Sequence, residues 1–152
     1  MYWKAGTVFV KGAALMGKPI LCLDFDGVCH SYTSGWQGVD VIPDGPVAGL
    51  WDFLEAASKE FEIHVYSSRS HQRGFYLHGT EAMINWFGVH APWLSAVTVS
   101  DSTITWYDVG VSLVFPQQKP LAFVTLDDRT LTFTGEWPTV EQLLAFKPWN
   151  KQ

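Results

Sequence analysis

Charged residues are scarce in this chain. They make up 16% of its 152 residues, and the formal net charge is −5. A protein that binds nucleic acid mainly through its phosphates usually presents a basic face, so this balance argues against a strongly electrostatic nucleic-acid binder. The composition still leaves room for a locally basic pocket.

Cysteine and long apolar runs are also lacking. The two cysteines, Cys22 and Cys29, follow no signal peptide, which favours reduced thiols over a disulfide framework. Near the N-terminus, the uncharged stretch Thr7–Val10 meets Lys11 and is far too short to span a membrane. We therefore expect a cytoplasmic protein with no membrane partner.

Apolar and aromatic residues are abundant instead. Hydrophobic residues make up 47% of the chain, with eight Trp and ten Phe, so it can bury a real core and is not of the disordered class. We expect residues 19–152 to form a single domain. Residues 1–18 are expected to be a loosely attached extension, with an edge strand at Thr7–Val10 as the alternative.

Short apolar runs alternate with amphipathic segments along residues 19–152. The predicted elements are strand Ile20–Leu23, helix Pro46–Lys59, strand Phe61–Tyr66, helix Thr80–Phe87, a hairpin over Val97–Trp106, strands Val111–Phe115, Leu121–Leu126 and Leu131–Phe133, and helix Thr139–Phe146. This order predicts an α/β fold, namely a three-layer, doubly wound, mostly parallel sheet with helices on both faces. The long glycine-rich loop over residues 28–45 is predicted to be functional.

Polar side chains follow three of the predicted strands. Asp24 and Asp26 follow the first strand, Ser67-Ser68-Arg69 the second, and Asp127-Asp128 a later one. In open α/β sheets, ligands bind beyond the carboxyl ends of the strands. We therefore expect these groups to share one site.

The segment Asp24-Phe25-Asp26-Gly27-Val28 suggests the chemistry. Two crowded carboxylates repel each other unless a cation lies between them, and Mg²⁺ prefers hard oxygen ligands. An aspartate can attack phosphorus to form an aspartyl-phosphate, and a second can act as general acid and base. The alternative is a simple Asp-Gly turn, which the preceding buried strand disfavours.

The remaining candidates fit the same chemistry. Ser67 and Ser68 are predicted to bind phosphate oxygens and Arg69 a phosphate or the substrate body, with a helix N-cap and a solvated Arg as the alternative. Lys119 is predicted to stabilise the transferring phosphoryl group, although a lone loop lysine is often merely solvated. Asp127 and Asp128 are predicted to bind the metal, or to orient a bound water.

These motifs, in this order over residues 20–128, resemble those of the haloacid dehalogenase-like superfamily. The resemblance implies a Rossmann-like core with a minimal cap or none, and Mg²⁺ as cofactor. It also implies roles for each residue: Asp24 as nucleophile and metal ligand, Asp26 as acid/base that binds metal through its carbonyl, Ser67 and Lys119 on the phosphate, and Asp127 and Asp128 completing the metal site.

A narrower resemblance concerns the substrate. Ser67-Ser68-Arg69 and Asp127-Asp128-Arg129 are similar to the phosphatase domain of phage polynucleotide kinases, although Ser68 stands where Gly is expected. The whole chain is similar to small phage and prophage hydrolases, and it has no kinase-type phosphate loop. The resemblance implies a phosphomonoester hydrolase for phosphorylated small molecules, such as nucleotides, or nucleic-acid ends, in the host cytoplasm if phage-encoded.

Other functions are also compatible with these residues. One is a phosphate-binding or protein-interaction module that kept the fold and lost turnover. A receiver domain is disfavoured because its adjacent acids should lie on the first strand, and a dehalogenase would not need every acid. Tyr32 and Trp36 either stack a base of the substrate or pack their loop against the domain.

Overall fold

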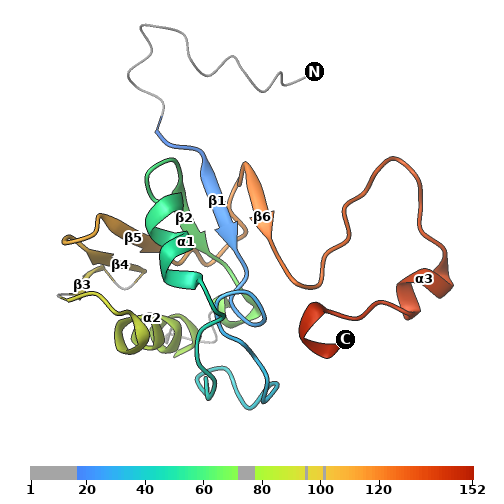
Figure 1. Ribbon diagram of the computed structural model, residues 1–152, viewed down its shortest axis with the longest axis horizontal. Coiled ribbons are helices and arrows are strands. Elements are labelled where there is room, and N and C mark those ends of the chain that lie inside the picture. Colours follow the sequence, from blue (N-terminus) through green and yellow to red (C-terminus); the bar gives the residue numbers. More distant parts are fainter. Residues whose placement is uncertain (1–16, 72–77, 95, 101) are drawn as a thin grey trace, which may run out of the picture.

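The computed structural model describes residues 17–71, 78–94, 96–100 and 102–152, so the predicted extension lies almost wholly outside the described residues. Its centre is a six-stranded sheet in the order β3-β4-β5-β2-β1-β6 (Figure 1). The strands are β1 (Ile20–Leu23), β2 (Glu62–Val65), β3 (Ala96–Ser100), β4 (Thr103–Trp106), β5 (Val111–Val114) and β6 (Val124–Leu126).

The sheet is mixed. β5, β2, β1 and β6 run parallel to one another, whereas β3, β4 and β5 form antiparallel pairs. The predicted hairpin over Val97–Trp106 is therefore confirmed, and so is an α/β fold. Parallel neighbours require crossover connections, which the helical segments between β1 and β2 and between β2 and β3 provide.

Both longer helices pack on the same face of the sheet. These are α1 (Leu50–Ala57) and α2 (His78–His90), and Trp51 of α1 touches Trp86 and Phe87 of α2. The strand residues that share their core are neighbours in register: Leu21, Ile63, Leu113 and Ile104. Among the described elements these two helices thus form one layer on the sheet, and the predicted second helical layer is not shown.

Local geometry shifts both predicted helices. α1 begins at Leu50 and not at Pro46, because Pro46 forms a bridge with His30 and Gly49 takes a positive φ of 85°. α2 begins at His78 and not at Thr80, and it ends at His90 and not at Phe87, so Gly88 lies within the helix.

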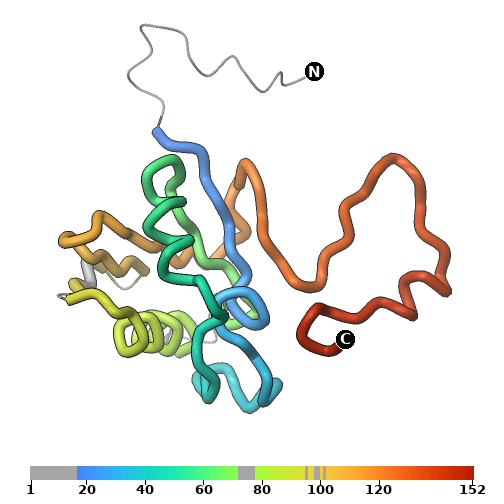
Figure 2. The backbone as a smooth tube through the Cα atoms, viewed as in Figure 1, coloured from blue at the N-terminus to red at the C-terminus, as the bar shows by residue number. Residues whose placement is uncertain are grey.

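The chain leaves the sheet after β6, as the tube in Figure 2 shows. β6 is shorter than predicted, and no strand forms over residues 131–133, because that segment has no neighbouring strand to pair with. The closing helix α3 (Val140–Leu144) is shorter than predicted. The spacing of Thr139 and Gln142 in the sequence is that of a capping box, and the two residues form one at the start of the helix. Two short 3-10 helices, η1 (Ser68–Ser70) and η2 (Trp149–Lys151), complete the fold. No helix of the described residues is long and apolar enough to cross a membrane.

Candidate metal and phosphate site

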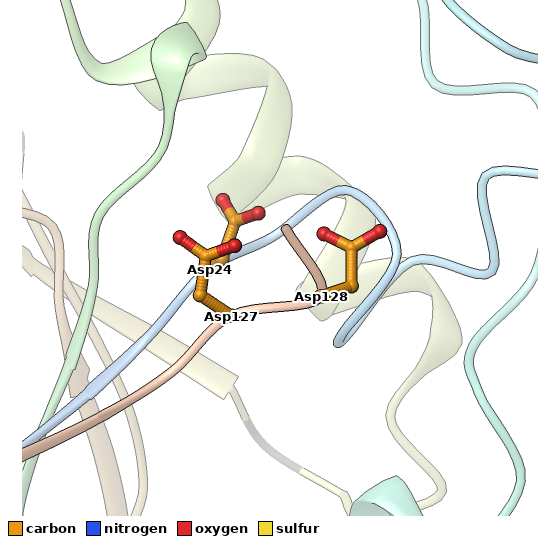
Figure 3. A group of neighbouring side chains, drawn as sticks. All are labelled: Asp24, Asp127 and Asp128. Atoms are coloured by element: carbon orange, nitrogen blue, oxygen red, sulfur yellow. The ribbon is translucent and has the colours of Figure 1, made fainter. Parts of the chain in front are cut away.

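Three carboxylates converge where β1 and β6 end. β1 and β6 pair in parallel with Leu23 opposite Leu126, and the N–H of Asp24 donates to the carbonyl of Leu126 over 2.9 Å. This pairing places Asp24 beside Asp127 and Asp128, and each of the three offers an oxygen within 4.8 Å of the other two (Figure 3). Residues far apart in sequence thus form one acidic cluster, as the strand-end pattern predicts.

The electrostatics of this acidic cluster favour a bound cation. Burial raises the pKa of Asp24 to about 7, and repulsion from Asp127 and Asp128 adds to the shift, although a 2.8 Å hydrogen bond from the N–H of Phe25 opposes it. Burial, with repulsion from Asp127, also raises the pKa of Asp128. Each upward pKa shift means that the negative charge of the carboxylate is not fully balanced by its surroundings. A hard divalent cation would balance this charge.

The two carboxylate oxygens of Asp128 also indicate a bound cation. Both of its carboxylate oxygens are buried, and neither has a hydrogen-bond partner among the described residues. Buried polar atoms almost always have a hydrogen-bond partner, so a buried carboxylate without one indicates a binding site for a ligand. Mg²⁺ takes a few carboxylate oxygens and keeps several waters, so the residues present fit this ion. One oxygen of Asp127 instead accepts from the N–H of Arg129, over 2.8 Å.

Gly27 lies directly against the carboxylate of Asp128 in the acidic cluster. Its φ is 84°, in the left-handed region that glycine enters without strain, and a Cβ there would collide with the carboxylate of Asp128. The turn closes when the N–H groups of Cys29 and His30 donate to the carbonyl of the fully buried Phe25. Glycine is therefore needed both for the turn and for the approach of Asp128.

The carboxylate of Asp26 makes a different set of contacts from those of the acidic cluster. His30 donates from Nδ1 to one oxygen over 2.9 Å, and Arg69 donates from Nε to the other over 2.9 Å. Burial works to raise the pKa of Asp26, but these two hydrogen bonds and the Arg69 charge bring it below its usual value. The side chain is thus a hydrogen-bonded anion, and the metal role that the resemblance gives Asp26 concerns its carbonyl.

Arg69 is fully buried, so the alternative of a solvated Arg is wrong. Its Nη1 donates to the carbonyls of Gly38 and Val39 over 2.7 and 2.9 Å, and its guanidinium carbon lies 4.5 Å from the centre of the Trp36 ring. Arg69 thus joins the long loop to Asp26, and the two N–H donors of its Nη2 have no partner among the described residues.

The two serines before Arg69 differ in their surroundings. Ser67 is buried, and its hydroxyl accepts from the N–H of Arg69 over 3.2 Å. Ser67 and Ser70 together form the capping box of η1, which is the N-cap alternative to phosphate binding. Ser68 is exposed. Phosphate binding by Ser67 and Ser68 stays a prediction. It would require the Ser67 hydroxyl to exchange its hydrogen bond with the N–H of Arg69 for one with phosphate.

Lys119 lies in the loop between β5 and β6 and is exposed. Burial raises the pKa of the Cys22 thiol, and the positive charge of Lys119 partly offsets this shift. Among the described residues Lys119 makes no hydrogen bond or ion pair. Its role on the phosphoryl group therefore stays a prediction.

His30 lies close enough in sequence to Asp24 and Asp26 to be a candidate for facing the site, and in the structure it contacts Asp26. It is fully buried, and its Nε2 accepts from the N–H of Asp44 over 3.1 Å. This bond assigns the ring proton to Nδ1, which faces Asp26. The available signal was the four-residue spacing from Asp26 to His30, which places both at one turn.

The long loop over residues 28–45 and the segment that contains Trp149 both make hydrogen bonds near the site. Asp44 accepts from the N–H and hydroxyl of Ser34, and its own carbonyl accepts from the indole of Trp86. Trp149, which is half-exposed, donates from its indole to the carbonyl of Gly27 over 2.8 Å. The loop that carries Trp36 is therefore packed against the domain, and base stacking stays a prediction.

Comparison with known proteins adds no assignment. No family model matches the chain, and no curated protein or solved structure matches it either. The function of the protein is therefore inferred from the geometry of the acidic cluster and of the Asp26–Arg69–His30 group.

Proposed function

We propose that this protein is a Mg²⁺-dependent phosphomonoester hydrolase with Asp24 as its nucleophile. The observation that carries the proposal is the acidic cluster at the ends of β1 and β6, with the unpaired buried carboxylate of Asp128. Asp24, Asp127 and Asp128 would hold the ion by their carboxylates, and Asp26 by its carbonyl. The strand-end pattern of the sequence and the acidic cluster both support a bound cation, and the resemblance supports Mg²⁺ as that cation.

The proposed reaction has two displacements at phosphorus. One oxygen of Asp24 accepts from the N–H of Phe25, which orients the carboxylate and leaves the other oxygen to attack. A bond forms between that oxygen and phosphorus as the ester bond breaks, and the leaving oxygen takes a proton. Water then attacks the aspartyl-phosphate, its proton passes to a base, and phosphate and Asp24 are released.

The residues around Asp24 supply positioning and proton transfer. Asp26 is the proposed acid and base, and His30 and Arg69 hold its carboxylate in one orientation. Bound Mg²⁺ would neutralise the crowded carboxylates and the charge on the phosphoryl group. The fit of nucleotides or nucleic-acid ends as substrates is part of the proposal, and the resemblance supports it.

A second candidate function is a phosphate-binding or interaction module with weak turnover. Two observations favour it: the pKa of Asp26 is lowered, which disfavours a proton donor at neutral pH, and Lys119 is exposed and makes no hydrogen bond or ion pair among the described residues. Both candidates share the metal. They differ in whether phosphate release follows binding.

Release of phosphate from p-nitrophenyl phosphate separates the candidates. Turnover should require Mg²⁺, stop with EDTA and fall at least about 1,000-fold in Asp24→Asn, which removes the nucleophile. Asp108→Asn, at an exposed position outside the site, is the matched control. Mg²⁺ binding without turnover on this ester or on 3′- and 5′-phosphorylated oligonucleotides favours the binding module. Activity that survives both EDTA and Asp24→Asn contradicts the proposal.

A further inference from the structure

The last residues of the chain return from α3 toward the turn that follows β1 (Figure 1). Trp149 donates from its indole Nε1 to the carbonyl of Gly27 over 2.8 Å, and the side chain of Asn150 donates to the carbonyl of Ser31 over 3.3 Å. The two residues of the first bond are 122 positions apart in the sequence. Tertiary contacts therefore hold the end of the chain beside the candidate site.

The residue that Trp149 contacts belongs to the candidate site itself. Gly27 directly follows Asp26, whose carbonyl is proposed to bind the metal, and it lies against the carboxylate of Asp128. Because consecutive Cα atoms are about 3.8 Å apart, the indole of Trp149 contacts the residue next to that proposed ligand. The ring therefore borders the space beside Asp24, where the body of a bound phosphate ester would lie.

The exposed part of Trp149 can contact a ligand only through its aromatic ring. The polar group of the side chain is the indole N–H, which the carbonyl of Gly27 already occupies. The residue is nevertheless 53% exposed, so ring carbon atoms make up the surface that it presents beside the site. Aromatic rings pair best with other aromatic rings, in offset-stacked or edge-to-face arrangements. This surface favours a ligand that carries an aromatic ring.

A second half-exposed tryptophan is held at the same turn. The guanidinium carbon of Arg69 lies over the ring of Trp36, 4.5 Å from its centre, and Arg69 donates to the carboxylate of Asp26. Trp36 is 52% exposed. The two indoles thus meet consecutive residues, Asp26 through Arg69 and Gly27 directly. Apolar side chains that are scattered singly over a surface need no explanation, whereas two indoles anchored at one turn of the candidate site indicate a binding surface.

We propose that Trp149 is a specificity-determining residue that stacks on an aromatic ring in the body of the phosphomonoester substrate. The inference rests on the proposed function, because it places the phosphate at Asp24 and the rest of the ester beside Gly27. Stacking on an aromatic side chain changes affinity roughly 5- to 150-fold. A contact made equally in the ground state and the transition state lowers KM and leaves kcat unchanged. Nucleoside monophosphates and aryl phosphates are the substrates of this class.

Two esters that differ by the base measure this contact. Adenosine 5′-monophosphate and ribose 5-phosphate carry the same primary phosphate ester on ribose, and only the first has an aromatic ring. The wild type with Mg²⁺ should hydrolyse the nucleotide with a KM at least about fivefold lower than that of the sugar phosphate, and with a similar kcat. Hydrolysis of ribose 5-phosphate also shows, for each variant, that the fold and the metal site are intact.

Two substitutions separate stacking from simple attachment of the chain end. Trp149→Gln keeps an N–H donor for the carbonyl of Gly27 but removes the ring, so most of the KM advantage of the nucleotide should be lost while the KM for ribose 5-phosphate is unchanged. Trp149→Phe keeps a ring but removes the N–H, so it should retain more of that advantage than Trp149→Gln. Trp137→Gln is the matched control, because Trp137 is 86% exposed and its ring contacts Phe133, and it should keep the full advantage.

The proposal is overturned by a wild type with equal KM values for the two esters, by a Trp149→Gln variant that loses both esters alike, or by a Trp149→Phe variant that loses the advantage while Trp149→Gln keeps it. The last two results would mean that Trp149 only attaches the chain end. If neither ester is hydrolysed, p-nitrophenyl phosphate still decides the proposed function, and calorimetry with Mg²⁺ decides this inference. The nucleotide should then bind more tightly than ribose 5-phosphate, and Trp149→Gln should remove the difference. Equal binding of the two esters, or no binding of either, overturns the inference.

Discussion

Arg69 donates from Nε to an oxygen of Asp26 over 2.9 Å, in a pair that joins the end of β2 to the turn after β1. The guanidinium is fully buried, and the same group holds the carbonyls of Gly38 and Val39. One side chain therefore links the second strand, the first turn and the long loop. The resemblance assigns Arg69 to substrate, whereas these contacts give it a structural role as well.

Replacing Arg69 should destabilise the fold. Arg69→Met removes the partner of a buried carboxylate and leaves two loop carbonyls unpaired, so the free energy of unfolding should fall by about 3–5 kcal/mol. Urea denaturation measures the change. Lys59→Met, at an exposed position, should change it by less than about 0.5 kcal/mol. In a double-mutant cycle, adding Asp26→Asn should recover part of the loss, since no buried charge then lacks a partner. Simple additivity would contradict the pairing.

Gly27→Ala should disturb both the turn and the acidic cluster. The left-handed conformation alone costs about 1 kcal/mol for alanine, and the new Cβ would displace Asp128. Unfolding should become easier by about 2 kcal/mol or more, and Mg²⁺ binding measured by calorimetry should weaken. Gly35→Ala is the matched control, because Gly35 also has a positive φ but open space around it, so only the conformational term applies. Equal losses in the two variants would argue against the Asp128 contact.

The raised pKa of Asp24 makes stability depend on pH and metal. Because its pKa is about 7 in the folded protein and 3.8 ordinarily, the folded state binds the extra proton between these values. Metal-free protein should therefore lose stability as pH rises from about 4 to about 7, and Mg²⁺ should restore it at pH 8.

Comparison of unfolding free energies at pH 5 and pH 8 in EDTA measures this effect. Asp24→Asn has no proton to lose, so its loss between the two pH values should be smaller than that of the wild type. Asp108→Asn should keep the wild-type difference. An Asp24→Asn variant with the full wild-type pH dependence would show that Asp24 is not the titrating group.

The hydrogen bond from Trp149 to Gly27 should fasten the end of the chain to the site. Trp149→Phe keeps a ring but loses the indole N–H, which is worth about 1 kcal/mol. Limited proteolysis should cut residues 147–152 faster in this variant than in the wild type. Tyr107→Phe, at an exposed position remote from this bond in sequence, serves as the control. Unchanged cleavage of Trp149→Phe would show that the bond does not hold the segment.

The sequence by itself determined the parts of the fold that depend on local pattern. The sequence contains three short apolar runs, which are followed by Asp24, by Ser67 and by Asp127. These runs predicted parallel strands whose carboxyl ends share one edge of the sheet. The capping box at Thr139 and Gln142 was also readable, because its two hydrogen bonds join residues three apart. The acidic cluster follows from these strand ends, since parallel neighbours bring their carboxyl ends together.

Only the tertiary structure decided the rest. The residues next to Arg69 in sequence do not predict its burial. Arg69 is buried because the distant loop that contains Gly38 and Val39 packs against it and accepts hydrogen bonds from its guanidinium. The side of the sheet on which a helix packs also depends on contacts between distant residues, such as Trp51 with Trp86, and not on the periodicity of either helix. The same holds for residues 131–146. Their pattern predicted a strand over Leu131–Phe133, which does not form, and a closing helix, which does. Whether that helix covers the sheet depends on long-range packing, which local spacing does not encode.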